Sequence, residues 1–259
     1  MAYQDFKGKR VIVTGASQGI GLAVATQLLF HGAQVIGLDI AFDAVIGDKN
    51  QPDGDGMFRF HLDISQRQSI KSLIDAIELQ LGPIDYLASV AGILRMSALL
   101  EHTEQDWLDT FDVNCHGPFI LCQAVAKQMK KRGNGAIVAV GSNAANTARL
   151  NMGSYCASKA ALTALIKGLA LELAADGIRC NLVAPGSTDT PMQRQLWQDE
   201  HGLKNTILGN GADYKLGIPL QRIATPDDIA KVVLFLLSDQ ARHITMENLL
   251  IDGGATLGH

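Results

Sequence analysis

The chain has 259 residues, of which 47% are hydrophobic and 26 are glycine, and its formal net charge is −4. This length and composition allow one large core, which favours a single domain over residues 1–259 and argues against disorder. The negative charge and the lack of a basic run argue against binding to nucleic acid or to an acidic membrane surface.

Targeting signals and metal motifs are not apparent in the sequence. The first ten residues have no apolar core, so no signal peptide is predicted, and no uncharged apolar run reaches the roughly 18 residues of a membrane span. The cysteines and histidines form no CxxC, HxH or HxxxH pattern. We therefore expect a cytoplasmic protein with reduced thiols and no metal site.

Short apolar runs alternate with segments of helical periodicity. In chain order, we expect a strand at 10–14, a helix at 19–31, strands at 34–38 and 57–61, a helix at 66–81, a strand at 84–89, a long helix within 104–131, a strand at 136–140, a helix at 154–175, a strand at 178–184, a helix at 226–237 and a strand at 248–251. This alternation indicates a Rossmann-like, doubly wound α/β fold, with a parallel sheet between two helical layers.

The alternation stops between Pro185 and Pro219, where the sequence becomes polar and irregular. The segment follows a predicted strand at the carboxyl edge of the sheet, where open α/β sheets bind ligands. Long loops in compact domains are usually functional or mobile. We therefore expect residues 186–217 to form a substrate lid.

The sequence Thr225-Pro226-Asp227-Asp228 is typical of a helix start, with a cap, a first-turn proline and two acids at the positive end of the helix dipole. We therefore interpret these acids as structural, not as a catalytic pair.

A glycine-rich turn, Thr14-Gly15-Ala16-Ser17-Gln18-Gly19-Ile20-Gly21, joins the first predicted strand to the first predicted helix. Glycines let the backbone approach a pyrophosphate, and the helix N-terminus offers free N–H groups. Such turns are common alone, but the strand–turn–helix context favours a dinucleotide site. The expected cofactor contacts here are Gly15, Ser17, Gln18, Gly19, Ile20 and Gly21.

Asp39 ends the next predicted strand, near the spacing of about 20 residues expected for a ribose-binding acid. Its carboxylate would accept hydrogen bonds from ribose hydroxyls and repel a 2′-phosphate. No Arg or Lys follows in Ile40-Ala41-Phe42. The pattern favours NAD over NADP, and a simple turn acid is the alternative.

Two further strand ends supply candidate cofactor contacts. Asp63 and Ile64 follow the third predicted strand and would face the adenine, with a helix N-cap as the alternative for Asp63. Ala91 and Gly92 follow the fourth and would pack close to the cofactor, or Gly92 only forms a turn.

Tyr155 and Lys159 lie about one helical turn apart, on the same face of a predicted helix. A tyrosine hydroxyl has a pKa of about 10, and a nearby cation favours its ionised form. Ser142 and Asn114 lie upstream. Each has a structural alternative, namely a solvated helix face for the pair, a turn or cap for Ser142 and a backbone contact within a helix for Asn114. Together they indicate a proton-transfer site.

The glycine turn combined with Asn114, Ser142, Tyr155 and Lys159 resembles the short-chain dehydrogenase/reductase family, over essentially the whole chain. Pro185-Gly186 and residues 252–254 are also similar to that family. One departure is Ser89-Val90-Ala91-Gly92, where the family usually has Asn-Asn-Ala-Gly. The packing role of those asparagines is therefore not carried over.

The resemblance implies a role for each residue of the set. Tyr155 is the acid/base, and Lys159 lowers its pKa and holds the nicotinamide ribose. Ser142 positions the substrate oxygen, and Asn114 holds a relay water near Lys159. The cofactor contacts that it implies beyond the glycine turn include Tyr155, Lys159, Pro185 and Thr188.

The resemblance also implies a homotetramer. The apolar face within 160–173 fits such an interface, and it fits packing on the protein's own sheet equally well.

Residues 91–96, 185–190, 215–220 and 252–258 resemble those family members that oxidise 2,3-dihydro-2,3-dihydroxybenzoate to a catechol for siderophore synthesis. These stretches lie in substrate-side loops and at the C-terminus, where relatives with other substrates usually differ.

The substrate that this resemblance implies is a cyclic dihydrodiol carboxylate. A guanidinium can hold a carboxylate bidentately. We expect Arg149 to be a main contact, with Arg95 and Arg194 as alternates; a surface ion pair is the alternative for each.

Two other functions stay open. The same fold could serve another alcohol or carbonyl, such as a 3-oxoacyl carrier protein, although Asp39 argues against NADPH-linked reductases. A non-catalytic dinucleotide-binding sensor or scaffold is the third interpretation, but such a protein has no need of Ser142, Tyr155 and Lys159 together.

Overall fold

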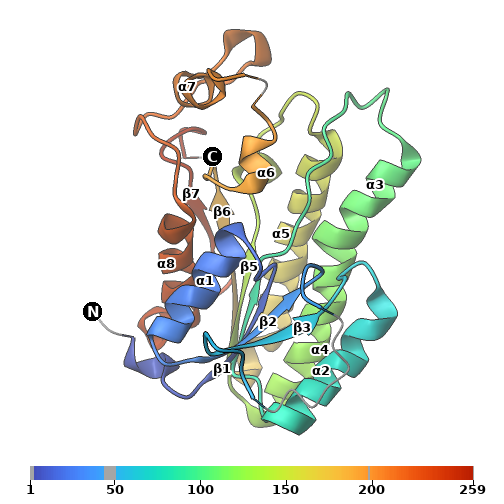
Figure 1. The fold of residues 1–259 in the computed structure, drawn as a ribbon, viewed down its shortest axis with the longest axis vertical. Coiled ribbons are helices and arrows are strands. Elements are labelled where there is room, and N and C mark those ends of the chain that lie inside the picture. Colours follow the sequence, from blue (N-terminus) through green and yellow to red (C-terminus); the bar gives the residue numbers. More distant parts are fainter. Residues whose placement is uncertain (1–2, 44–50, 198, 259) are drawn as a thin grey trace.

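The computed structural model describes residues 3–43, 51–197 and 199–258, which form a parallel sheet between two layers of helices (Figure 1). Seven parallel strands pair in the order β3-β2-β1-β4-β5-β6-β7. They are β1 (Arg10–Thr14), β2 (Gln34–Asp39), β3 (Met57–His61), β4 (Tyr86–Ser89), β5 (Gly135–Val140), β6 (Ile178–Pro185) and β7 (Asn248–Ile251). The predicted fold class is confirmed.

Helices α1 and α8 pack on one face of the sheet, and α2, α4 and α5 pack on the other (Figure 1). The α-helices are α1 (Gly19–Phe30), α2 (Arg67–Leu81), α3 (Glu104–Phe111), α4 (Gly117–Arg132), α5 (Gly153–Leu173), α6 (Pro191–Arg194), α7 (Gly202–Leu208) and α8 (Pro226–Leu237). Short helical turns are η1 (Gln4–Phe6), η2 (Asp112–His116), η3 (Asn143–Ala145), η4 (Ala174–Asp176), η5 (Gly211–Asp213) and η6 (Asp239–Ala241).

The strands divide the core into two parts because successive side chains point to opposite faces. In β1, Ile12 packs with Ile74 of α2, whereas Val11 and Val13 pack with Leu28 of α1. All five side chains are fully buried. Each such burial stabilises the fold by about 1.5–3 kcal/mol.

The strand order reverses between β1 and β4, where doubly wound sheets bind their ligands. The Thr14 hydroxyl at the end of β1 accepts hydrogen bonds from Val90 N at 2.9 Å and Ala91 N at 3.1 Å. This contact ties the two strand ends together. Helices α6 and α7 lie beyond the same end of the sheet (Figure 1).

The structure differs from the predicted elements in two places. The predicted helix within 104–131 is divided into α3 and α4 by η2, which is a π-helical turn. The predicted irregular lid contains α6, whose start at Thr190-Pro191 is capped by the Thr190 hydroxyl accepting from Gln193 N at 3.2 Å. The lid also contains α7.

The predicted start of α8 is confirmed. The Thr225 hydroxyl accepts from Asp228 N at 3.2 Å, and Asp228 Oδ2 accepts from Thr225 N at 2.9 Å, which together form a capping box. Within the described residues, no helix is long and apolar enough to cross a membrane.

Candidate active site

Two glycines of the turn after β1 are closely packed. A Cβ atom on Gly21 would lie 2.0 Å from the carbonyl oxygen of Gly15. Gly15 has a φ of +68°, which favours glycine, and a Cβ there would lie 3.1 Å from Ala91 Cα. The turn therefore runs close to the chain after β4.

The first turn of α1 offers backbone N–H groups at this point. Gln18 is the N-cap residue, and its side chain caps none of the N–H groups in the described helix. Such groups suit the oxygens of a pyrophosphate. The glycine turn therefore fits a dinucleotide, as the sequence predicts.

The buried Asp39 carboxylate lies beside the glycine turn. Its Oδ2 accepts a hydrogen bond from Ser17 N at 3.0 Å, and its Oδ1 accepts one from Ala41 N at 2.9 Å. These two contacts hold the carboxylate next to the turn. There it could accept hydrogen bonds from ribose hydroxyls and would repel a 2′-phosphate.

Asp63 forms a local turn after β3. Its Oδ1 accepts hydrogen bonds from Ser65 N at 2.9 Å and Ser65 Oγ at 2.7 Å. Helix α2 begins only at Arg67, with Gln66 as N-cap, so Asp63 is not its cap. Ile64 is buried in the core. Contact of either residue with an adenine stays a prediction.

Asn114 is fully buried in the π-helical turn η2 and fixes the chain after β4. Its Oδ1 accepts from Ile93 N at 2.8 Å, and its Nδ2 donates to Ile93 O at 2.9 Å and to Ser158 Oγ at 3.1 Å. The Ser158 hydroxyl donates to Tyr155 O at 2.8 Å. Asn114 therefore links the chain after β4 to the helix that carries Tyr155.

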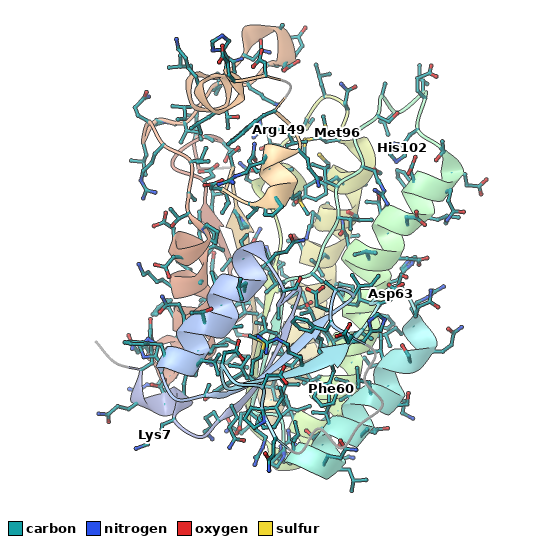
Figure 2. All side chains as sticks on the ribbon, viewed as in Figure 1. Lys7, Phe60, Asp63, Met96, His102 and Arg149 are labelled. Atoms are coloured by element: carbon teal, nitrogen blue, oxygen red, sulfur yellow. The ribbon has the colours of Figure 1, made fainter. Side chains whose placement is uncertain are left out.

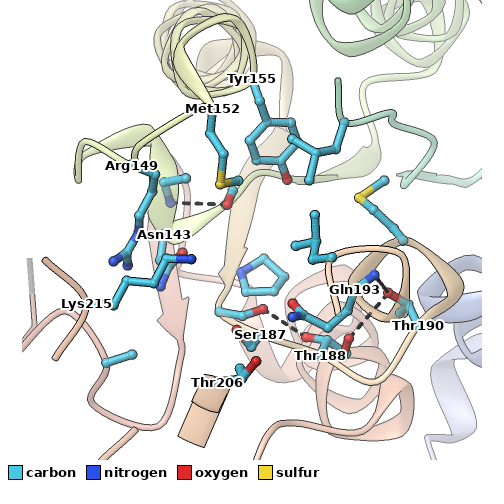
Figure 3. A pocket seen from close by; sticks show the side chains of 18 of the residues that line it. Asn143, Arg149, Met152, Tyr155, Ser187, Thr188, Thr190, Gln193, Thr206 and Lys215 are labelled. Atoms are coloured by element: carbon cyan, nitrogen blue, oxygen red, sulfur yellow. Dashed lines mark hydrogen bonds between the residues drawn. The ribbon is translucent and has the colours of Figure 1, made fainter. Parts of the chain in front are cut away.

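The structure brings Ser142, Tyr155 and Lys159 together. The Tyr155 hydroxyl points into a pocket (Figure 3) and is hydrogen-bonded to Ser142, which follows β5 and caps η3. Lys159 is buried, and its Nζ donates to Val140 O at 2.9 Å and lies 5.8 Å from the centroid of the Tyr155 ring.

Burial shifts the pKa values of Tyr155 and Lys159. Burial raises the pKa of Tyr155, and the hydrogen bond from Ser142 opposes this rise. Burial lowers the pKa of Lys159 to about 8. The Lys159 ammonium group donates to Val140 O and is itself desolvated, and its effect on the tyrosine pKa stays a prediction.

The pocket beside Tyr155 has a volume of about 450 Å³ and is lined by residues of the sheet end, α5 and the lid (Figure 3). Pro185 at the end of β6 and the buried Thr188 are among the lining residues, and the Thr188 hydroxyl donates to Gly186 O at 3.1 Å. This placement suits the predicted contacts of both residues.

The three candidate arginines differ in their surroundings. Arg149 is half-buried, lines the pocket and lies at the lid end of the molecule (Figure 2). Arg95 is exposed, with Nε 3.7 Å from Asp106 Oδ1, and Arg194 donates to both oxygens of Asp189 at 2.7 and 3.0 Å. Neither of these two lines the described pocket. Of the three arginines, Arg149 lines the described pocket, and contact of any of them with a substrate stays a prediction.

Comparison with known proteins identifies the family. A family model described as Enoyl-(Acyl carrier protein) reductase matches residues 15–256. The chain is 44% identical to 2,3-dihydro-2,3-dihydroxybenzoate dehydrogenase of Bacillus subtilis (strain 168), over the full length of both. The chain belongs to the short-chain dehydrogenase/reductase family.

Two further proteins are similar to this chain. The vibriobactin-specific 2,3-dihydro-2,3-dihydroxybenzoate dehydrogenase of Vibrio cholerae serotype O1 is 44% identical, over 96% of this chain and 97% of the relative. The structure of Thermoplasma acidophilum aldohexose dehydrogenase has a TM-score of 0.85 and 30% identity, covering 98% of this chain and 96% of that one.

Membership in the short-chain dehydrogenase/reductase family implies an oxidoreductase with a nicotinamide dinucleotide cofactor. The uncapped start of α1 and the closely packed glycines fit that group. No cluster of three or more potential metal ligands occurs in the part of the chain that the structure describes.

Sequence reasoning missed several residues of the site. Asn143 and Met152 line the pocket but carry no motif that singles them out, and Lys215 lines it too but stands out only as part of the stretch 215–220. Helix α6 could have been found, because Thr190-Pro191 has the same cap-and-proline start as Thr225-Pro226.

Proposed function

We propose that this protein is an NAD-dependent dehydrogenase that oxidises 2,3-dihydro-2,3-dihydroxybenzoate to 2,3-dihydroxybenzoate in catechol siderophore synthesis. The observation that carries the proposal is Arg149, a cation that lines the pocket into which the Tyr155 hydroxyl points and forms no ion pair among the described residues. Similarity over the full chain to two enzymes named for this substrate supports the assignment.

In the proposed reaction, the ionised Tyr155 takes the proton from a ring hydroxyl of the substrate. Ser142 holds the same oxygen by a hydrogen bond. A nicotinamide cofactor held at the glycine turn would supply the acceptor for the hydride from the carbon that bears this hydroxyl. The ketone formed tautomerises to an aromatic catechol, which makes the oxidation strongly favourable.

Lys159 and Asn114 support this proton transfer. The pKa of Lys159 is lowered to about 8, so the ammonium form predominates at neutral pH. This form can donate hydrogen bonds to ribose hydroxyls. Through its hydrogen bonds to Ile93 and Ser158, Asn114 holds the chain after β4 against helix α5. We also propose that Asn114 holds a water molecule near Lys159 that relays the proton, as the family resemblance implies.

The preference for NAD over NADP rests on Asp39. Its carboxylate is buried beside the glycine turn, and the next residues supply no cation for a 2′-phosphate. An acid at this position hydrogen-bonds the ribose of NAD.

Tyr155→Phe tests the mechanism. The variant keeps the ring but loses the proton acceptor, and general base catalysis contributes about 10²–10⁴-fold. We expect kcat, measured by NADH absorbance with the dihydrodiol, to fall by that factor, while the Kd for NAD changes little. A wild-type kcat would refute the mechanism.

The same assay separates the alternatives. A non-catalytic sensor binds NAD without turning over any alcohol or carbonyl. A 3-oxoacyl carrier protein reductase oxidises NADPH with that substrate and leaves the dihydrodiol unchanged. Our proposal expects turnover of the dihydrodiol with NAD.

A further inference from the structure

The lid contributes a cation to the substrate pocket. Lys215 is exposed, lines the pocket and forms no ion pair with any described residue. Figure 3 shows Lys215, Asn143 and Arg149 on the same side of the pocket, with the Tyr155 hydroxyl pointing toward its centre. Two segments far apart in the sequence thus bring positive charge to one side of the site.

A closed turn fixes the backbone of Lys215. Its N–H donates to Asn210 O at 2.9 Å, and its carbonyl oxygen accepts from Asn210 N at 2.9 Å. At the base of this turn, a Cβ on Gly209 would lie 2.5 Å from Gly217 N, so the chain entering the turn closely contacts the chain leaving it. The turn therefore holds the origin of the Lys215 side chain beside the pocket.

The carboxylates that line the pocket have other partners. Asp213 Oδ2 accepts from Asn210 Nδ2 at 2.9 Å, and Asp199 Oδ1 accepts from His201 N at 2.9 Å. In the described structure, neither acid forms an ion pair with Lys215 or Arg149. Both cations are therefore available to an anionic ligand.

We propose that Lys215 and Arg149 bind the substrate carboxylate together, so that the lid recognises the acid group of the substrate. The Arg149 guanidinium suits bidentate contact with a carboxylate. The Lys215 ammonium, on its flexible side chain, can reach the same carboxylate from the lid. This inference rests on the proposed function for the identity of the substrate. It adds a specificity-determining residue from the lid.

The consequence is selectivity between carboxylated and neutral rings. A ring without the carboxylate leaves both cations without a partner, so it gains nothing from Lys215. A carboxylated ring gains a charge-assisted contact with the lid. Loss of the lysine therefore weakens binding of the acid alone.

Isothermal titration of the protein with NAD present tests this, with 2,3-dihydroxybenzoate and catechol as the two probes. We expect Lys215→Gln to raise the Kd of 2,3-dihydroxybenzoate by about tenfold, the effect typical of a charged hydrogen bond, and to leave the Kd of catechol unchanged. Lys215→Arg keeps the charge and should retain most of the affinity.

Lys204→Gln is the matched control. Lys204 is an exposed residue of α7, outside the described pocket lining and without an ion pair among the described residues. Its loss should change neither Kd. If Lys215→Gln weakens both probes equally, weakens neither, or behaves as Lys204→Gln does, the inference is wrong.

The double variant Arg149→Gln/Lys215→Gln gives a second readout. If both residues hold one carboxylate, the combined change in Kd differs from the product of the single changes. Independent effects would contradict a shared site. Because these titrations measure binding, Lys215 is tested even if the dihydrodiol is not turned over.

Discussion

Among the described residues, Ser142 is the side chain that opposes the effect of burial on Tyr155. Burial raises the pKa of the phenol, and the hydrogen bond from Ser142 lowers it. Lys159 lies one turn along the helix but donates to Val140 O. The tyrosine pKa therefore depends on a residue that follows β5, outside the helix that carries Tyr155.

Ser142→Ala should shift the pH profile. Without the hydrogen bond the pKa of Tyr155 rises further, so less ionised tyrosine is present at any given pH. We expect the rising limb of log kcat/KM to move to higher pH and the plateau to fall. Ser154→Ala is the control, because the buried Ser154 hydroxyl has no partner among the described residues. An unchanged limb in Ser142→Ala would show that another group sets this pKa.

Asp39→Asn tests cofactor choice. The amide keeps the shape of the side chain but removes the charge that repels a 2′-phosphate, and such repulsion costs several kcal/mol. We expect the ratio of kcat/KM for NADP to that for NAD to rise by at least about tenfold. Asp43→Asn, at an exposed acid nearby, should leave the ratio unchanged. An equal ratio in both variants would refute the role of Asp39.

Sequence spacing predicts that Tyr155 and Lys159 share a helix face, because helical geometry is local. It does not predict that the Lys159 ammonium donates to Val140 O or that Asp39 accepts from Ser17 N. Both contacts join segments distant in the sequence, so they depend on how the strands pack.

At the scale of elements, the glycine turn and α1 form one close-packed unit. The chain passes so near itself that a Cβ on Gly21 would lie 2.0 Å from Gly15 O. Because that neighbour is backbone, relief requires movement of the turn or of the helix. The same movement would displace the N–H groups that we expect to face a pyrophosphate.

Gly21→Ala should therefore destabilise the fold and weaken NAD binding, as measured by chemical denaturation and NAD titration. Gly168→Ala in α5 is the control, because a Cβ there meets no atom within 4 Å and helical Ala is more stable than Gly by about 0.5–1 kcal/mol. We expect Gly21→Ala to lower the free energy of unfolding and the affinity for NAD, and Gly168→Ala to lower neither. Equal stability of the two would contradict the close packing.

Hydrophobic periodicity predicts most elements because each strand and helix presents a continuous apolar face. It does not predict the π-helical turn at Asp112–His116. A Cβ on the adjacent Gly117 would lie 2.4 Å from Ile64 O, so the break occurs at a long-range contact. It also misses α6 and α7, which are short and bury no side chain completely.

For the whole molecule, strand order brings the functional segments together. The turns after β1 and β4 meet where the order reverses, and the lid lies beyond the same edge (Figure 1). The sequence predicts this edge, because parallel sheets bind ligands at their carboxyl ends. It does not predict which lid residues line the pocket, since the path of an irregular segment depends on its own tertiary contacts.

The homotetramer stays a prediction, as does the cytoplasmic location. Large apolar side chains are partly exposed on three helices, namely Trp107 on α3 at 38%, Phe119 on α4 at 42% and Leu171 on α5 at 69%. We expect light scattering to give the mass of four chains of 27.7 kDa each. The mass of one chain would refute the tetramer.

The most direct test of the proposed function is simultaneous measurement of NADH and aromatic product after addition of purified 2,3-dihydro-2,3-dihydroxybenzoate and NAD. The proposed reaction predicts equal amounts of NADH and 2,3-dihydroxybenzoate, formed by the wild type and nearly absent with Tyr155→Phe. No NADH from the wild type, or NADH without the aromatic acid, would contradict the assignment of this substrate.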